Sequence, residues 1–480
     1  MNFYFTAAEV LDRLDSKKGS IKGLISTVAE KDRKRTSALV IQTLKYKPVL
    51  EDIIGRAKLM LEEHKKLTSS NLALVLVHDV LFSNGIQAGD GPIKQAILRH
   101  KTRLHSELQK VKIKRGVKSN EELVQTGDTL IPRYVRINTT LWTIEEAIQY
   151  FISKGFTLEN ITSKHIFAKD KHISALFLFH PEVSFQDDDA YKNGKVILQD
   201  KASCFPAVVL NPPVSPNGAV IDATSAPGNK TSHLSTLMCN TGTLFAFERD
   251  RKRFSTLRAM LLKARCKNVE PVNTDFLMVD PMDPKYSGVT HILLDPSCSG
   301  SGIVNRLDYL VESEQEAGSV QEDRLNKLAS FQLMMVKHSM KFPAVQRIVY
   351  STCSVHAIED EHVVRAALKS DEAISRHFEL APQSQVLPQW KRRGYSNEMD
   401  DPHHAASLVR CLPGEDATNG FFVSCFVRSS VIREESDRAL PDKKRKVDQI
   451  IEEQQDVALD TRRRQEKRKR KKIVNGGGSV

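Results

Sequence analysis

The sequence predicts an α/β fold, in which a doubly wound sheet is preceded by a small α/β module and an N-terminal helical domain. Three observations support this prediction. Strand and helix candidates alternate over 196–428, shorter ones alternate over 130–195, and apolar residues recur at helical spacing before residue 115. We therefore expect four segments, at residues 1–125, 126–195, 196–430 and 431–480.

The N-terminal segment is predicted to be helical. Apolar residues keep helical spacing over 38–54, and Pro48 predicts a break or kink there. Ser69 or Ser70 is expected to cap an apolar helix over 71–82. A further helix, expected over 93–111, has a basic face that is either a solvated surface or an RNA contact, made of Lys94, Arg99, Lys101, Arg103 and Lys110.

Short apolar runs bounded by turns predict the strands of two sheets. In the small module, strands are expected over 132–138 and 176–179, with a helix over 143–154. In the larger segment, helices are expected over 232–238, 251–265 and 324–342, between strands at 219–221, 244–247, 289–294, 347–350 and 421–427. Such alternation is typical of an open, mostly parallel sheet.

The charge balance predicts a polyanionic partner. The chain carries 71 Lys and Arg against 59 Asp and Glu, a net charge of +12. This excess favours nucleic acid or an acidic membrane surface, and it does not separate RNA from DNA. No run approaches the roughly 18 apolar residues of a membrane span, and Met1–Phe5 lacks the order of a secretory signal. We therefore expect an intracellular protein without membrane contact.

The C-terminal segment, residues 431–480, is charged and lacks aromatic residues, so we expect it to be disordered. Two basic clusters lie in it, at 441–447 and 462–472. They are typical of nuclear-import signals, and the alternative is a non-specific RNA-binding tail. The two interpretations are compatible.

Seven cysteines are scattered along the chain, and none forms a C-x-x-C pair: Cys204, Cys239, Cys266, Cys298, Cys353, Cys411 and Cys425. This spacing disfavours zinc sites and redox motifs, and we expect no metal. A sparse, odd set in a long intracellular chain indicates mostly free thiols, and a free thiol can act as a nucleophile.

A strand followed by a turn of small residues predicts a cofactor loop. Ala219–Ile221 runs into Asp222–Thr231, which would expose backbone N–H groups at a helix N-terminus. A dinucleotide fingerprint needs more glycines, and a phosphate-binding loop needs Gly where this chain has Asn229. Glu248 ends the next strand, where it could accept the hydroxyls of a ribose; the alternative is a surface carboxylate beside two arginines.

Two further strands lead into candidate reactive groups. The strand over 289–294 precedes Asp295 and Cys298 in a Gly/Ser-rich loop, and the strand over 347–350 precedes Cys353. In an open α/β sheet, reactive groups collect beyond the carboxyl ends of the strands. A buried cysteine is usually a small hydrophobe, but these two, 55 residues apart at equivalent strand ends, could converge on one crevice.

Together these segments resemble the Nol/Nop/Sun family of RNA cytosine-C5 methyltransferases. The resemblance covers about residues 130–428 and rests on five motifs, Asp222–Thr231, Asp295–Gly300, Ser351–Ser354, Leu198–Ser203 and Asn419–Val423. Residues 37–44 and 46–50 resemble the subgroup that acts on eukaryotic 25S/28S rRNA. The chain departs from the family at Thr224-Ser225, where many members have Cys-Ala, at Asn229, where many have Gly, and at Asn419, where Asp is frequent. These departures leave the cofactor affinity open.

The resemblance implies a Rossmann-like, S-adenosylmethionine-dependent methyltransferase sheet over 196–430. It implies that Cys353 attacks C6 of cytosine and that Cys298 assists release of the adduct. It further implies that Asp295 hydrogen-bonds the amino and N3 edge of the base, and that Lys230 orients Asp295 and lowers a thiol pKa. The implied cofactor contacts are Thr224, Ser225, Ala226, Pro227, Gly228, Asn229, Lys230, Glu248, Arg253, Asp275 and Asp295.

The resemblance also implies an RNA partner, 25S/28S rRNA or a pre-ribosomal particle, and a place in the nucleus and nucleolus. We expect a monomer, since nothing predicts a coiled coil. Two alternatives stay open: an RNA-binding ribosome-assembly factor with weak or no catalysis, and a tRNA cytosine-C5 methyltransferase. An amino-group methyltransferase is disfavoured, because Asn211-Pro212-Pro213 precedes the cofactor loop and lacks the aromatic residue of the N-P-P-Y/F motif.

Overall fold

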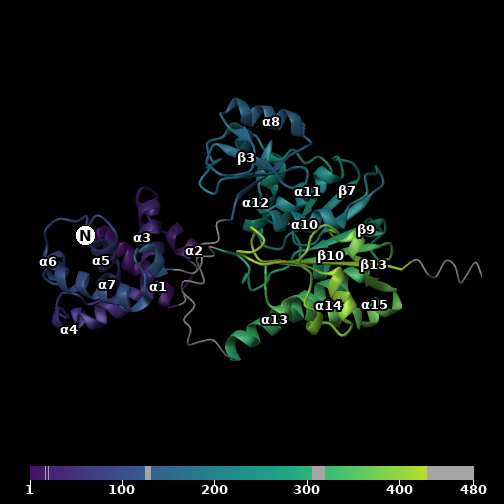
Figure 1. The fold of residues 1–480 in the computed structure, drawn as a ribbon. Helices are drawn as coiled ribbons and strands as arrows, with labels where there is room; N and C mark the ends of the chain where they lie inside the picture. Colours follow the sequence, from purple (N-terminus) through teal and green to yellow (C-terminus); the bar gives the residue numbers. More distant parts are fainter. Residues whose placement is uncertain (17, 20, 125–130, 305–318, 430–480) are drawn as a thin grey trace, which may run out of the picture.

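The computed structural model describes residues 1–429 except 17, 20, 125–130 and 305–318. The predicted disordered tail and its two basic clusters lie outside the described residues. An N-terminal helical part lies beside a larger body that contains two sheets (Figure 1). None of the helices in the described ranges is long and apolar enough to cross a membrane.

The described residues before 125 form helices around an apolar core of their own: α1 (Asn2–Asp15), α2 (Ile21–Ser26), α3 (Glu30–Arg56), α4 (Leu59–Glu62), α5 (Ser70–Phe82), α6 (Pro92–Arg99) and α7 (Lys101–Arg115). The Ser69 hydroxyl accepts a hydrogen bond from the Leu72 N–H and caps α5, as predicted. Pro48 does not break the helix, because α3 continues through it, and a kink there stays a prediction. Val49 and Leu50 are buried in the core, and this packing offsets the backbone hydrogen bond that proline removes.

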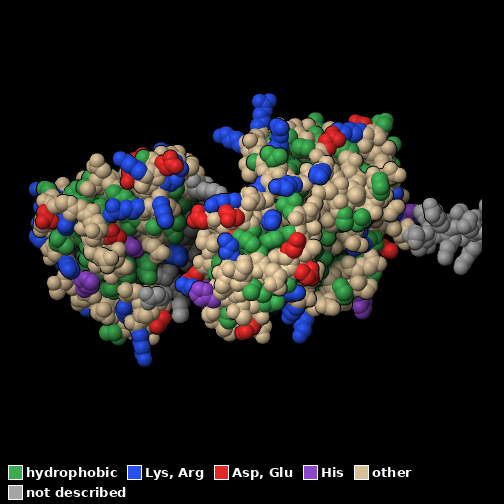
Figure 2. Space-filling view, turned by 90° about the horizontal axis from the view of Figure 1, so that it is seen from above, with side chains coloured by type: hydrophobic (Ala, Val, Ile, Leu, Met, Phe, Trp, Pro, Cys, Tyr) green, Lys and Arg blue, Asp and Glu red, His purple; other side chains and the backbone are tan. Residues whose placement is uncertain are grey.

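The helix expected over 93–111 is two helices, which meet at His100. Their basic face is largely neutralised by acidic neighbours. Arg99 donates to Glu63 and Arg103 to Glu62, while Lys110 and Lys94 pair with Glu107 and Asp90 respectively. On the visible face of this part, Lys and Arg are interspersed with acidic and apolar side chains (Figure 2). These pairs favour the solvated-surface interpretation over an RNA contact.

The small module is a five-stranded sheet in the order β2-β3-β4-β1-β5 with a helix over it. Its elements are β1 (Arg133–Ile137), α8 (Ile144–Ser153), β2 (Thr157–Leu158), β3 (Ile166–Lys169), β4 (Leu176–Phe179), α9 (Asp189–Lys192) and β5 (Val196–Leu198). Thr143 and Glu146 form a capping box that starts α8. The core of the module is aromatic, with Phe151, Phe167 and Phe179 in mutual contact. β5 lies just beyond the expected segment boundary at 195 and pairs with β1.

The main sheet has the strand order β11-β13-β10-β9-β6-β7-β8, with β12 paired to β13. The strands are β6 (Ala219–Asp222), β7 (Thr243–Phe247), β8 (Val269–Val272), β9 (Val289–Leu294), β10 (Arg347–Thr352), β11 (Phe378–Leu380), β12 (Val409–Cys411) and β13 (Phe421–Arg428). The central strands β10, β9, β6, β7 and β8 run parallel, and β13 is antiparallel to β10. The five expected strands are confirmed, whereas β8, β11 and β12 were not expected.

Helices cover both faces of this sheet, as its apolar strands predict. They are α10 (Lys201–Leu210), α11 (Asn229–Leu237), α12 (Arg251–Lys263), α13 (Ser319–Met340), α14 (Glu361–Leu368) and α15 (Asp371–Ser375). The side chains of successive residues in a strand point to opposite faces of the sheet. Val220 and Leu293 pack with α10 and α11, whereas Ile221 and Leu294 pack with α13 and α14.

Buried polar contacts join the small module to the main body. Asp170, between β3 and β4, forms an ion pair with Lys201 of α10 at 2.6 Å, and both side chains are almost fully buried. Arg136 of β1 is fully buried and donates to Gln199 and to Ser232 of α11. Arg136 has no acidic partner among the described residues, and burial lowers its pKa to about 10. These contacts connect the module to the helix that follows the cofactor loop.

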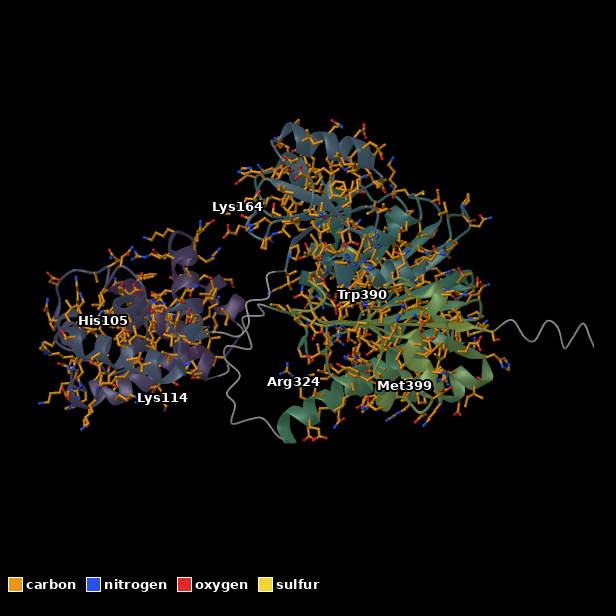
Figure 3. The ribbon with its side chains drawn as sticks, viewed as in Figure 1. His105, Lys114, Lys164, Arg324, Trp390 and Met399 are labelled. Carbon is orange, nitrogen blue, oxygen red and sulfur yellow. The ribbon has the colours of Figure 1, made fainter. Side chains whose placement is uncertain are left out.

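An aromatic contact supports the same junction. Trp390, labelled in Figure 3, packs edge-on against His172 of the module and Phe205 of α10. The Trp390 indole N–H donates to the carbonyl of Arg410 at 2.8 Å, so its polar edge is satisfied although the ring is buried.

A fully buried cation, Arg410, stabilises the segment that follows β10. The Arg410 guanidinium lies between Asp360 and Glu361, and all three side chains are inaccessible to solvent. Arg410 also donates to the carbonyl of Val355 at 3.1 Å. Burial raises the pKa of Asp360 well above its usual range, and the charge of Arg410 opposes this. Removing the arginine would leave a buried carboxylate uncompensated.

We expect Arg410→Met to lower the free energy of unfolding by about 3–5 kcal/mol, the usual cost of breaking a buried ion pair. Urea unfolding followed by tryptophan fluorescence measures it, because Trp390 contacts Arg410. Arg392→Met is the control: Arg392 pairs with Glu415 and Asp416 near the surface, where such pairs contribute about 0–1 kcal/mol. Equal losses in the two variants would contradict the expectation.

Candidate active site

A cavity opens beyond the carboxyl ends of β6, β7, β9 and β10, where open α/β sheets bind ligands. Five loops, including the one after β8, and α13 form its wall: Ala223, Thr224, Ala226, Phe247, Glu248, Arg249, Arg253, Thr274, Asp275, Phe276, Asp295, Pro296, Ser297, Cys298, Gly300, Ile303, Phe331, Met335 and Cys353. No group of three or more His, Cys, Asp or Glu in the described part of the chain is arranged to hold a metal ion.

Asp222, the last residue of β6, holds the cofactor loop in place through hydrogen bonds. Its buried carboxylate accepts hydrogen bonds from the Thr231 hydroxyl at 2.8 Å and the Thr224 N–H at 3.3 Å. Burial raises the pKa of Asp222 to about 6. Gly228 has φ of +112°, and a Cβ there would lie 3.0 Å from the Met260 side chain, so the turn requires glycine before α11 begins.

Lys230 and Asp295 form an ion pair beside the cavity, with 2.7 Å between Nζ and Oδ2. The Ser203 hydroxyl accepts a second hydrogen bond from Lys230, and the Ser351 hydroxyl donates to the other Asp295 oxygen at 2.9 Å. The Asp295 N–H donates to the Thr224 hydroxyl. Burial, the largest single influence, lowers the pKa of Lys230, but the charge and hydrogen bond of Asp295, with smaller contributions from Cys353 and Asp222, together raise the net pKa, so the ammonium stays charged.

The two predicted reactive cysteines meet at the cavity wall. Cys298 Sγ lies 2.9 Å from Cys353 Sγ, which confirms the expected convergence of two strand ends. The Gly302 N–H donates to the Cys353 carbonyl at 2.9 Å and holds the two loops together. All seven cysteines are free thiols, as the sequence indicated, and Cys204, Cys411 and Cys425 are buried away from this pair.

The contact between the sulfurs makes the two thiols unequal. The hydrogen bond from Cys298 lowers the pKa of Cys353; burial and Asp295 oppose this, and the charge of Lys230 adds to the lowering. The same hydrogen bond, together with burial, raises the pKa of Cys298. Cys353 is therefore favoured as the thiolate, and Cys298 as the thiol that donates to it.

The two flanking motifs also come together. The Asp200 carboxylate accepts hydrogen bonds from the Thr418 hydroxyl and from the Asn419 amide, the latter at 2.9 Å. The side-chain oxygen of Asn419, Oδ1, accepts a hydrogen bond from the Val304 N–H, just after the Cys298 loop. The Asn419 side chain can donate to the Asp200 carboxylate and accept from the Val304 N–H at the same time. An aspartate at position 419 could not donate to Asp200 when ionised, so asparagine suits this position.

Comparisons with known proteins agree with this geometry. Three family models match the chain: the NOL1/NOP2/Sun domain family member 5 N-terminal domain over residues 34–124, its ferredoxin-like domain over 131–199, and the 16S rRNA methyltransferase RsmB/F over 207–427. The 25S rRNA (cytosine-C(5))-methyltransferase rcm1 of Schizosaccharomyces pombe is 45% identical over 88% of this chain and 91% of its own length. The chain belongs to the NOL1/NOP2/Sun family of RNA cytosine-C5 methyltransferases.

Two further relatives agree with the assignment. The mouse 28S rRNA (cytosine-C(5))-methyltransferase is 39% identical over 90% of this chain and 92% of its own length. The crystal structure of PH0851 matches the fold with a TM-score of 0.58 at 19% identity, over 84% of this chain and 91% of that one. The predicted fold class, with its parallel methyltransferase sheet and N-terminal helical region, is confirmed.

The cofactor of this NOL1/NOP2/Sun methyltransferase is S-adenosylmethionine, and the cavity residues fit it. Glu248 is only 6% exposed, so the surface-carboxylate alternative is wrong. One Glu248 oxygen accepts from the Asp250 N–H, and the other lies 3.6 Å from Arg253 Nε. Glu248 lines the cavity, where it could accept ribose hydroxyls. Arg253 donates to the Ala226 carbonyl at 2.9 Å, and Asp275, paired with Arg249, continues the wall.

The structure divides the predicted site residues into two groups. Those that line the cavity are Thr224, Ala226, Glu248, Arg253, Asp275, Asp295, Cys298 and Cys353. Those that do not line it are Ser225, Pro227, Gly228, Asn229 and Lys230. The Ser225 hydroxyl donates inward to the Asp222 carbonyl, and the Asn229 carbonyl accepts from Arg136. These five residues shape the turn or support Asp295, and their direct contact with cofactor stays a prediction.

Sequence reasoning missed residues that act on the site from outside its motifs. Phe331 and Met335 of α13 close the cavity on its apolar side, and Gln332 and Glu359 contact the Cys298 loop. Ser203 and Ser351 stand inside recognised motifs, but nothing in the sequence shows their bonds to Lys230 and Asp295. The Asn211 turn ends α10 in a left-handed conformation, consistent with its interpretation as a turn.

We expect iodoacetamide to alkylate Cys353 with an apparent pKa below the ordinary cysteine value of about 8.5. The thiolate reacts, so the rate should persist to lower pH than in a free thiol, and Cys298→Ala should move the profile to higher pH by removing the hydrogen bond. Mass spectrometry of the Cys353 peptide gives the rates. Cys425→Ala, in buried β13, is the control; a profile indifferent to Cys298 would refute the assignment of the thiolate.

We expect Glu248→Gln to weaken S-adenosylmethionine binding about 10- to 100-fold, because a hydrogen bond to a charged group contributes about 1.5–3 kcal/mol. Isothermal titration calorimetry measures the affinity. Glu270→Gln should bind as the wild type does, since Glu270 is exposed and pairs with Lys285 outside the cavity wall. Unchanged affinity in the Glu248 variant would remove this residue from the cofactor site.

Proposed function

We propose that this protein methylates C5 of a cytosine in large-subunit (25S/28S) rRNA through a covalent bond between Cys353 Sγ and C6 of the base. The observation that carries the proposal is the thiol pair, 2.9 Å apart, in a cavity wall that also holds Asp295 and the proposed ribose acceptor Glu248. The choice of rRNA rests on two relatives, which are named as 25S and 28S rRNA methyltransferases and match most of this chain.

The thiolate solves the main chemical difficulty of the reaction. C5 of cytosine is a poor nucleophile, and addition of Cys353 Sγ to C6 breaks the C5–C6 double bond and makes C5 enamine-like. S-adenosylmethionine supplies an electrophilic methyl group. After C5 is alkylated, a water molecule takes the C5 proton. The electrons of the C5–H bond form the C5–C6 double bond again while the S–C6 bond breaks, which returns the thiolate. Cys298, the protonated member of the pair, assists this release.

Asp295 and Lys230 orient the base. An Asp295 oxygen can accept from the exocyclic amino group of cytosine, which uracil lacks, and this distinguishes the two bases. Lys230 and Ser351 hold the carboxylate at 2.7 and 2.9 Å, so its direction is set before the base arrives. Lys230 also favours the thiolate of Cys353 electrostatically.

A base in a duplex cannot reach this cavity, so the target must be unpaired or rotated out of its helix at a cost of a few kcal/mol. The net charge of +12 suits an RNA partner. We assign the shape and phosphate contacts to the small module, because acidic neighbours pair with most of the predicted basic face on α6 and α7. We further propose a monomer that works in the nucleus and nucleolus, where large-subunit rRNA is modified.

Two other functions lead to different results. A ribosome-assembly factor without catalysis would not need both thiols, Asp295 and Lys230 in contact. A tRNA methyltransferase would use the same chemistry on another RNA, and only the identity of the labelled RNA separates it.

We expect the protein, with tritiated S-adenosylmethionine, to label one cytosine in large-subunit rRNA from Schizosaccharomyces pombe cells that lack the rcm1 relative. Bisulfite sequencing locates the mark. Cys353→Ala should reduce labelling at least 1,000-fold, on the order of the loss for removing an enzyme nucleophile. Cys239→Ala, an exposed cysteine elsewhere, is the control. Labelling that survives in Cys353→Ala would refute the mechanism, and labelling confined to tRNA would refute the substrate.

A further inference from the structure

The backbone on either side of Cys298 is held by two buried side chains. Gln332 Nε2 of α13 donates to the Ser297 carbonyl at 3.1 Å, and Glu359 Oε1 accepts from the Ser299 N–H at 2.8 Å. Gln332 and Glu359 also bond to each other, at 3.0 Å, and both are inaccessible to solvent. Together they form a clamp, the Gln332–Glu359 clamp, around the residue between Ser297 and Ser299.

The clamp is joined to the strand that carries the other cysteine. Tyr350 of β10, three residues before Cys353, donates its hydroxyl to the Glu359 carbonyl and lies 3.0 Å from Gln332 Oε1. Tyr350 is fully buried, and its ring packs in the sheet core. The clamp therefore fixes the position of Cys298 relative to β10, the strand that also positions Cys353.

Glu359 is more than a packing residue. Its second oxygen, Oε2, is buried and has no hydrogen-bond partner among the described residues. The neighbouring cation, Arg410, is taken by Glu361 and Asp360. A buried carboxylate with one free oxygen is costly to keep, which indicates that the hydrogen bond to the Ser299 N–H has a use. The charge of Glu359 also adds to the raised pKa of Cys298, after the Cys353 hydrogen bond and burial.

We propose that Gln332 and Glu359 are positioning residues that hold the Cys298 thiol against Cys353 and thereby set the rate at which the RNA adduct is released. This inference rests on the proposed function, in which Cys298 assists release. Ser299 and Ser301 tie the later part of this loop to Ser354, whereas the clamp holds the backbone on both sides of Cys298. A displacement of about 1 Å can cost on the order of 100-fold in rate. Bond formation by Cys353 depends less on the clamp, because Cys353 follows β10 directly.

The test measures trapped adduct and methylation in the same cells. Full-length chains are expressed in Schizosaccharomyces pombe lacking the rcm1 relative, purified under denaturing conditions, and the covalently bound RNA is end-labelled. Gln332→Met and Glu359→Met preserve side-chain volume while removing the clamp. We expect at least 5-fold more trapped RNA than in the wild type, with methylation reduced at least 5-fold. Glu359→Gln keeps the acceptor for the Ser299 N–H and should stay within 2-fold of the wild type on both measures.

Two controls separate the possible failures. Ser339→Ala alters a buried hydroxyl of the same helix that bonds only within α13, and it should trap no more RNA than the wild type. If Cys298 assists release, Cys298→Ala should trap RNA. Absence of the adduct in that variant would refute the proposed release role of Cys298. Adduct in Cys298→Ala but not in Gln332→Met or Glu359→Met would overturn the clamp alone.

A purely structural role for the clamp predicts a different outcome. Loss of fold would lower trapped RNA and methylation in parallel, whereas defective release raises one and lowers the other. Binding of S-adenosylmethionine by the purified variants identifies those that are folded, and Gln332→Met decides the question if Glu359→Met does not fold. Parallel losses in a variant that binds cofactor normally would refute the proposal.

Discussion

The ion pair between Lys230 and Asp295 is the contact on which the arrangement of the site depends. Four elements meet there: Lys230 stands in the first turn of α11, Asp295 follows β9, Ser203 belongs to α10 and Ser351 to β10. Because the pair is largely buried, removal of either partner would leave the other without its ion-pair partner in a poorly solvated place. The cofactor loop, the carboxylate that we propose binds the base, and the strand that precedes Cys353 are thus fixed relative to one another.

The two thiols illustrate how the same residue type acquires different properties. Cys298 and Cys353 are chemically identical, yet the hydrogen bond between them raises one pKa and lowers the other. Lys230 on one side and Glu359 on the other add to this difference. The assignment of nucleophile and release thiol is consequently a property of the surroundings of the pair, and each group that creates the surroundings comes from a different segment of the chain.

Buried charges recur throughout the larger body, and each lies at a junction between elements. Lys201 and Asp170 join the small module to α10, Arg136 connects β1 to α11, and Arg410 with Glu361 supports the loop after Cys353. A buried ion pair adds little to stability, but a buried charge that loses its partner is strongly destabilising. Placing such contacts at the junctions aligns the module, the cofactor loop and the thiol loops with one another.

Local patterns in the sequence determined the strands β6, β7, β9, β10 and β13, the cofactor turn, and the identity of Asp295, Cys298 and Cys353, because apolar periodicity and short motifs act over a few residues. They were insufficient where distant packing decides: α3 continues through Pro48, acids pair with the basic N-terminal face, and the strands β8, β11 and β12 had no strong apolar signal. Only the tertiary structure brought Gln332 and Glu359 to the Cys298 loop and lowered the pKa of Cys353 while raising that of Cys298. Hydrogen bonds and burial between residues far apart in the chain set these properties, and no local pattern encodes them.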